Sequence, residues 1–181
     1  ALFLPVKEKV LMITRGGHEG EIFRKVGMDY MARFAYDLGD VPYKPDGGML
    51  CILLSKNNHT AAFSTYATHG WGGARTLGAK VNKAQDLAQV AHADCYVLSH
   101  DHTQAVTRGN ILGLPKSKLS CKRKVYLQIT RQLFVNTGGF QTYAGYIQRK
   151  GYTPQDMGTP RIRMELKKDH NGYYKDLHSG I

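Results

Sequence analysis

Short apolar runs separated by glycines and polar turns predict a mixed α/β chain. Residues 10–14 form a compact run of strand-forming side chains that stops at Gly16, which predicts a buried strand followed by a loop. Apolar positions at helical spacing between Met28 and Leu38, closed by Gly39, predict an amphipathic helix with a glycine C-cap.

Two further segments predict a β-hairpin. Residues 49–55 and 60–68 are rich in strand formers, and the polar residues 56–58 between them favour a turn. A glycine-rich loop, residues 69–76, follows directly. Asn82 is placed to cap a helix with an apolar face of alanine and leucine. The pattern therefore places a loop and a helix directly after the hairpin.

Four histidines follow the predicted strands. The strand, loop, helix and strand between residues 60 and 98 form a predicted βαβ unit, whose strands should be parallel with a right-handed crossover. His69 follows the first of these strands, His100 and His102 follow the second, and His18 comes soon after the first apolar run of the chain. Ligands of open α/β sheets bind at the carboxyl ends of parallel strands. The sequence thus predicts a cluster of imidazoles at one sheet edge.

The spacing of His100 and His102 suggests metal binding. In an extended chain they would project to the same side with Cα atoms ~6.6 Å apart, so they could reach two neighbouring metal ions or clasp one. Two ions ~3.5–4 Å apart would hold a phosphate and activate a bridging water. Imidazole suits Zn, Fe and Ni, and Mn is a further candidate ion, so the ligands alone do not name the metal among Mn, Zn, Fe and Ni. The structural alternative is that His18 or His69 is an ordinary loop histidine.

Composition and net charge indicate which classes of molecule the chain is expected to bind. The chain has 181 residues and a formal net charge of +11, so we expect one domain that attracts phosphate-bearing molecules, nucleotides and nucleic acid in particular. No apolar run approaches the ~20 residues of a membrane-spanning helix, and no membrane partner is expected. Three widely spaced cysteines are typical of a reducing compartment, which favours the cytoplasm. The lysine-rich residues 116–124 are a solvated loop or a nucleic-acid contact.

The remaining chain is expected to be mostly β. Residues 125–129 and 161–166 alternate, and residues 133–135 form a short apolar run. The last residues, 167–181, are polar and are expected to form a tail rather than an element. Arg75 and Lys80 are cations that we place in the glycine-rich loop, where they could meet a substrate phosphate; the alternative is that they are merely solvated.

Taken together, three motifs resemble those of the calcineurin-like metallophosphoesterases, and the segments 66–80, 135–140, 151–154 and 158–160 resemble a branch of that family in bacteria and phages. Residues 16–19, Gly-Gly-His-Glu, resemble the family's Gly-Asn-His-Glu; residues 68–70, Thr-His-Gly, resemble its lone-histidine motif; and residues 99–102, Ser-His-Asp-His, resemble Gly-His-x-His. The similarity covers about residues 10–166. The family's two preceding aspartate motifs are not in the chain, so we expect an N-terminally incomplete domain that begins partway through a larger protein.

The resemblance implies a four-layer α/β/β/α sandwich, formed by the single domain 1–181, and a centre with two divalent metal ions. By position, His69 and His100 would bind one ion and His102 the other. His18 would donate to the phosphate or protonate the leaving oxygen as the catalytic residue. The implied activity is metal-dependent hydrolysis of phosphomonoesters or phosphodiesters in the cytoplasm of a bacterium or phage-infected cell, provided the missing aspartates are supplied.

Two alternatives stay open. Gly17 replaces the family's metal-binding Asn and has no side chain to offer, so the chain is alternatively a non-catalytic phosphoesterase scaffold that binds nucleic acid or serves in an assembly. The second alternative is a mononuclear zinc site in a protein of another fold, which uses only His100 and His102.

Overall fold

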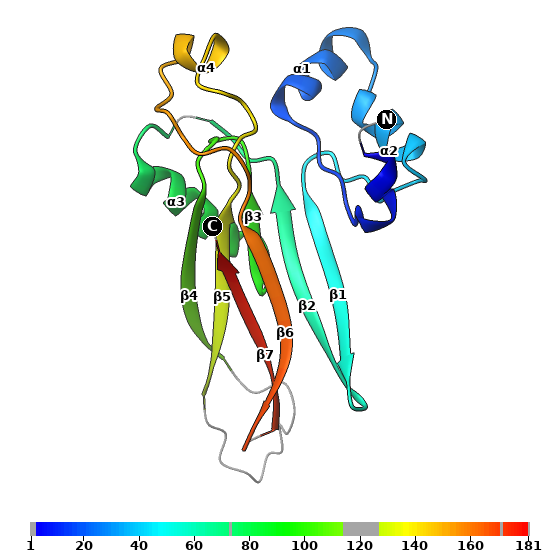
Figure 1. The fold of residues 1–181 in the computed structure, drawn as a ribbon, viewed down its shortest axis with the longest axis vertical. Helices are drawn as coiled ribbons and strands as arrows, with labels where there is room; N and C mark the ends of the chain where they lie inside the picture. The colour runs from blue at the N-terminus through cyan, green and yellow to red at the C-terminus, as the bar shows by residue number, and fades with distance from the viewer. Residues whose placement is uncertain (1–2, 73, 114–126, 171, 181) are drawn as a thin grey trace.

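The computed structural model describes residues 3–72, 74–113, 127–170 and 172–180. They form a mixed α/β fold with 24% helix and 39% strand, shown in Figure 1. In chain order the elements are η1 (Leu4–Lys9), α1 (Gly17–Val26), α2 (Tyr30–Asp37), β1 (Gly48–Lys56), β2 (His59–Thr68), α3 (Leu77–Asp86), η2 (Leu87–Gln89), β3 (Cys95–Leu98), β4 (Ala105–Gly113), β5 (Gln128–Asn136), α4 (Tyr146–Arg149), β6 (Arg161–Asp169) and β7 (Gly172–Gly180). None of the described helices is long and apolar enough to span a membrane.

The main sheet has five strands in the order β1-β2-β3-β5-β4. Strands β1 and β2 form the predicted antiparallel hairpin, whose turn places Asn57 and Asn58 at positive φ, as a tight hairpin turn requires. Strands β2, β3 and β5 run parallel, so the predicted βαβ unit is confirmed. Three carboxyl ends consequently meet at one edge of the sheet.

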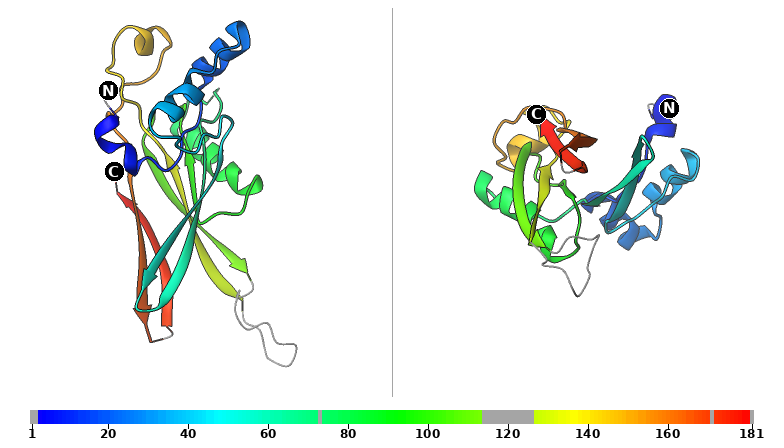
Figure 2. Two further views of the ribbon diagram at one scale, coloured as in Figure 1. Left: turned by 90° about the vertical axis from the view of Figure 1, so that its right-hand side faces the viewer. Right: turned by 90° about the horizontal axis from the view of Figure 1, so that it is seen from below.

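Alternate residues of the central strands face two different cores. Tyr96, Leu98 and Phe134 point to α3, whereas Cys95 and Val135 point to the hairpin β6–β7. Figure 2 shows α3 and this hairpin on opposite sides of β3 and β5. The described residues thus build helix, sheet and hairpin layers around the centre of the molecule. The expected four-layer sandwich is not confirmed, and the mixed α/β class is.

The N-terminal part has its own small core, and one prediction there is wrong. Residues 10–14 do not form a strand: Ile13 is buried among residues from α2 and the following turn, but it makes only an isolated bridge to Tyr43. No neighbouring strand runs alongside it within the described residues, so no ladder forms. The predicted helix is confirmed as α2, where the Asp29 carboxylate accepts hydrogen bonds from the N–H groups of Met31 and Ala32.

Two other boundaries differ from the sequence prediction. Helix α3 begins at Leu77 and not at Asn82, because the Thr76 hydroxyl accepts a hydrogen bond from the Ala79 N–H and caps the helix earlier. The expected polar tail is also wrong. Residues 172–180 form β7, in which Leu177 is buried between the sheets; single apolar positions in a polar segment carried too little periodicity to indicate a strand.

The pattern in the middle of the chain is partly confirmed. Of the predicted segments 125–129 and 133–135, residues 125 and 126 lie outside the described residues, whereas residues 128–129 and 133–135 belong to one strand, β5. Strand β4 was not predicted as a separate segment. β4 pairs with β5 as an antiparallel edge strand, a partnership that local sequence does not reveal. The lysine-rich residues 116–124 lie outside the described residues.

Candidate active site at the carboxyl edge of the sheet

The structure brings the predicted histidines to the edge where β2, β3 and β5 end. His69 follows β2, and His100 and His102 follow β3. His18 lies in the first turn of α1, not in the loop that the sequence predicted, and its side chain is exposed. Figure 1 shows α1 and α4 on either side of this edge.

His69 and His100 form the closest pair. Nε2 of His69 lies 3.0 Å from Nδ1 of His100, and the two rings are perpendicular with centroids 5.1 Å apart. Two nitrogens bound to one divalent ion at ~2.1 Å and separated by 90–109° would lie ~3.0–3.4 Å apart. The observed separation therefore suits two ligands of the same ion, as well as a hydrogen bond between one protonated and one unprotonated nitrogen.

The loop that carries His100 and His102 is not extended, contrary to the sequence prediction. Both residues have positive φ, 69° and 52°, a left-handed conformation that costs a non-glycine residue on the order of 1 kcal/mol. The i, i+2 argument for parallel side chains therefore fails. What brings the rings to the site is a tight loop held by tertiary contacts, and such conformations concentrate at functional sites.

Glycines lie against the histidine rings. A Cβ on Gly72 would lie 2.8 Å from Nε2 of His100, and a Cβ on Gly139 would lie 2.7 Å from Nδ1 of His102. Gly70 has positive φ and packs against Leu98. Larger residues would collide with the imidazoles, so the two glycine-containing loops are shaped around the histidine cluster.

Asp101, between the two histidines, is buried and anchors the loop. Its carboxylate pairs with Lys83 of α3 at 2.6 Å, and Lys83 also donates to the Trp71 carbonyl at 2.7 Å. Lys83 thus ties together the loop that follows β2 and the loop that follows β3. Neither Asp101 nor Lys83 was singled out from the sequence.

The two expected phosphate-binding cations have different surroundings. Arg75 is exposed in the loop before α3. Lys80 lies in α3, not in the loop, and is 5% exposed. Its ammonium donates to the Asp101 carbonyl at 3.2 Å and to the Thr103 hydroxyl at 2.7 Å. Lys80 therefore positions the histidine loop, a role that the sequence did not indicate.

Burial and mutual repulsion favour neutral imidazoles. Burial lowers the pKa of His69, and the neighbouring His100 lowers it further, against the opposing Glu19 carboxylate. The pKa values of His100 and His102 are lowered mainly by burial as well. Neutral imidazole is the form that binds metal ions.

The N-terminus of α1 meets His69. A Cβ on Gly17 would lie 3.9 Å from Nε2 of His69, and a Cβ on Gly16 would lie 3.6 Å from Cε1 of the same ring and 2.3 Å from a carboxylate oxygen of Glu19. The position where the resembled family has Asn is therefore directly beside His69. Glu19 adds a carboxylate on the same side, which the sequence reasoning did not consider as a ligand.

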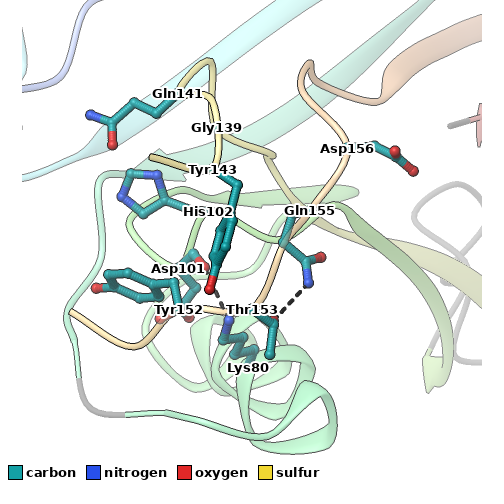
Figure 3. Close-up of a pocket in the computed structure, with 10 residues that line it drawn as sticks. All are labelled: Lys80, Asp101, His102, Gly139, Gln141, Tyr143, Tyr152, Thr153, Gln155 and Asp156. Carbon is teal, nitrogen blue, oxygen red and sulfur yellow. Dashed lines mark hydrogen bonds between the residues drawn. The ribbon is translucent and has the colours of Figure 1, made fainter. Parts of the chain in front are cut away.

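A small cavity of about 20 Å³ lies next to His102, on the opposite side of the site. Figure 3 shows His102, Tyr143 and Tyr152 around it, with Lys80 reaching it from α3. The rings of His102 and Tyr152 are 5.5 Å apart. The volume suits about one water molecule, so this cavity does not hold a substrate in the described conformation.

The tightest group of potential metal ligands lies elsewhere. Within the described part of the chain, the one group of three whose ligand atoms all lie within 4.8 Å of each other is Glu165, Asp176 and His178 of the β6–β7 hairpin. Lys167 contacts both carboxylates, so a cation already compensates them. His69, His100 and His102 do not meet this criterion together.

No family model, no curated protein and no solved structure matched the chain. The histidine cluster is therefore interpreted from its own geometry and from the three motifs of the sequence.

Proposed function

We propose that the chain carries the histidine part of a dinuclear metal centre that hydrolyses phosphate esters. The observation that supports this most is the 3.0 Å approach of His69 and His100, two residues 31 positions apart that share a neutral, half-buried environment. The contact between His100 and His69 counts against the hypothesis of a mononuclear zinc site, which used only His100 and His102.

The proposed assignment follows the motifs. His69 and His100 hold one ion, and His102 holds a second one. That His102 does not join a tight group of three with the other two rings agrees with ligands divided between two ions. Divalent metal ions, when bound there, supply positive charge that polarises a phosphate ester and lowers the pKa of water.

The protein's own residues complete the proposed chemistry. His18, exposed in the first turn of α1, donates a proton or hydrogen bond to the ester. The N-terminal amides of α1 favour an anion near Gly17, and the excess of positive charge attracts phosphate compounds to the protein. Nucleotides and nucleic acid are the favoured substrate class.

The alternative is a non-catalytic scaffold for nucleic acid or assembly. It is favoured by Gly17, because this residue beside Nε2 of His69 has no ligating side chain. Metal analysis of the purified full chain separates the two proposals: stoichiometric divalent metal supports the enzyme, and its absence after Mn²⁺ or Zn²⁺ loading supports the scaffold.

The test of the enzyme is hydrolysis of bis(p-nitrophenyl) phosphate in MnCl₂. His100→Ala and His102→Ala are each expected to lower turnover at least about 100-fold, since even groups that only orient metal ligands contribute 10–100-fold. His92→Ala, an exposed histidine after η2, is the matched control and should retain wild-type turnover. Turnover that survives both ligand substitutions would refute the proposal.

A further inference from the structure

A second, larger cavity opens beside His69. It has a volume of about 540 Å³, within the ~300–1,000 Å³ range of small-molecule sites. It lies between the N-terminus of α1, the end of β2 and the segment around η2. Its lining includes cationic, aromatic and glycine positions, namely Arg15, Arg24, Gly17, Tyr66, His69 and Trp71. We refer to this cavity as the His69 groove.

Two aromatic side chains line the groove. Tyr66 of β2 is partly buried against the core under α3, whereas Trp71 is 48% exposed. The backbone of Trp71 is held in place, because its carbonyl accepts the 2.7 Å hydrogen bond from buried Lys83. A large exposed ring on an anchored loop is suited to stacking on a planar ligand, and base–aromatic stacking is tolerant of base identity.

Positive charge faces the same groove. Arg15 lines it and is held by Asp29 at 3.0 Å and at 3.6 Å by Asp46, an exposed carboxylate that lines the groove as well. Arg24, one turn beyond Gly20 on α1, also lines it, and no ion pair is found for Arg24 within the described residues. The first turn of α1 has no side-chain cap, so its amides add positive potential, part of which the Glu19 carboxylate of the same turn offsets. The groove therefore combines a stacking surface with groups that attract anions.

We propose that the His69 groove binds the nucleoside monophosphate unit of the substrate, with the base against Trp71 and the phosphate between the N-terminus of α1 and His69. This inference rests on the proposed function for the reacting phosphate and names its substrate class. The unit comes either from a free nucleotide or from the end of a nucleic-acid strand, which share the base and the phosphate.

Trp71 makes binding directly measurable, because it is the single tryptophan of the chain. Adenosine 5′-monophosphate and a short single-stranded oligo(dA) are titrated into the full chain in EDTA, and the fluorescence of Trp71 is recorded. We expect saturable quenching by both ligands and none by ribose 5-phosphate, which lacks the base. Tighter binding of the oligonucleotide identifies a strand as the source of the unit, and equal binding identifies the free nucleotide.

Reversing the charge of Arg24 tests whether the nucleotide binds in the His69 groove. Arg24→Glu is expected to weaken the quenching titration at least about tenfold, as loss of one favourable charge contact predicts. Arg33→Glu is the matched control, because Arg33 lies on α2, pairs with Asp37 and does not line the groove. Far-ultraviolet circular dichroism checks that both variants are folded.

The hydrolysis proposal and the groove-binding proposal can be refuted independently of each other. His102 does not line the groove, so His102→Ala should lower hydrolysis at least about 100-fold and keep the quenching. Quenching without hydrolysis in the wild type would refute the catalytic proposal and leave the binding proposal standing. The groove assignment is overturned by equal quenching with ribose 5-phosphate, by no quenching at millimolar nucleotide, or by equal effects of Arg24→Glu and Arg33→Glu.

Discussion

The ammonium of Lys83 lies 2.6 Å from the carboxylate of Asp101, and both side chains are almost fully buried. Asp101 separates two histidines that both adopt a left-handed backbone conformation. The Lys83 ammonium also donates a hydrogen bond to the Trp71 carbonyl. One lysine of α3 therefore fixes the loop of the histidine pair and the loop of the proposed base-stacking residue.

Lys83→Met is expected to lower the free energy of unfolding by about 3–5 kcal/mol, because it leaves the buried Asp101 carboxylate unpaired. Urea denaturation followed by circular dichroism measures the change. Arg33→Met, which breaks the exposed pair with Asp37, should change stability by less than about 1 kcal/mol. The double variant Lys83→Met with Asp101→Asn should recover much of the loss; a loss as large as that of the single variant would contradict the account.

Gly17→Asn is expected to strengthen metal binding. The new side chain begins 3.9 Å from Nε2 of His69 without steric conflict, so its amide oxygen can join the histidines as a ligand. Titration calorimetry with MnCl₂ should show an affinity about tenfold higher or more, equal to about 1.4 kcal/mol. Gly78→Asn in the first turn of α3, where a Cβ meets nothing within 4 Å, serves as the control. Equal affinities in both variants would contradict a metal site beside Gly17.

The stability of the metal-free protein should fall as the pH is lowered through the range below 6.5. The pKa values of His69, His100 and His102 are lowered in the folded state, principally by burial, so the unfolded chain takes up protons first. The contribution is therefore fully present above 6.5 and is lost as pH falls toward the folded-state values. Urea unfolding in EDTA at pH 7.5, 6.5 and 5.5 measures it, and replacing the three histidines by Gln should flatten the dependence. An identical slope in that variant would exclude this origin.

Thiol labelling should distinguish the two described cysteines. Cys51 is exposed on β1, whereas Cys95 is buried in the sheet, and burial raises the pKa of its thiol to about 12. Iodoacetamide at pH 8, followed by peptide mass spectrometry, should modify Cys51 within minutes and Cys95 only after denaturation. Rapid labelling of Cys95 in the folded protein would show that β3 is not the buried central strand.

The sequence determined the elements whose signals are local. The hairpin of β1 and β2, the helix α2 and the parallel β2–β3 unit follow from periodicity and turn residues, and the order of strands placed His69 and His100 at one edge. These inferences needed only chain order and the fixed handedness of crossovers.

The tertiary structure decided what depends on distant partners. Residues 10–14 pair too little to form a strand, and β7 exists because β6 pairs with it and Leu177 enters the core. The left-handed turn at His100 is held through Asp101 by Lys83, 18 residues earlier in the chain. Such contacts leave no periodic trace in the sequence, because their free energy comes from burial and charge pairing that arise only when the chain is folded.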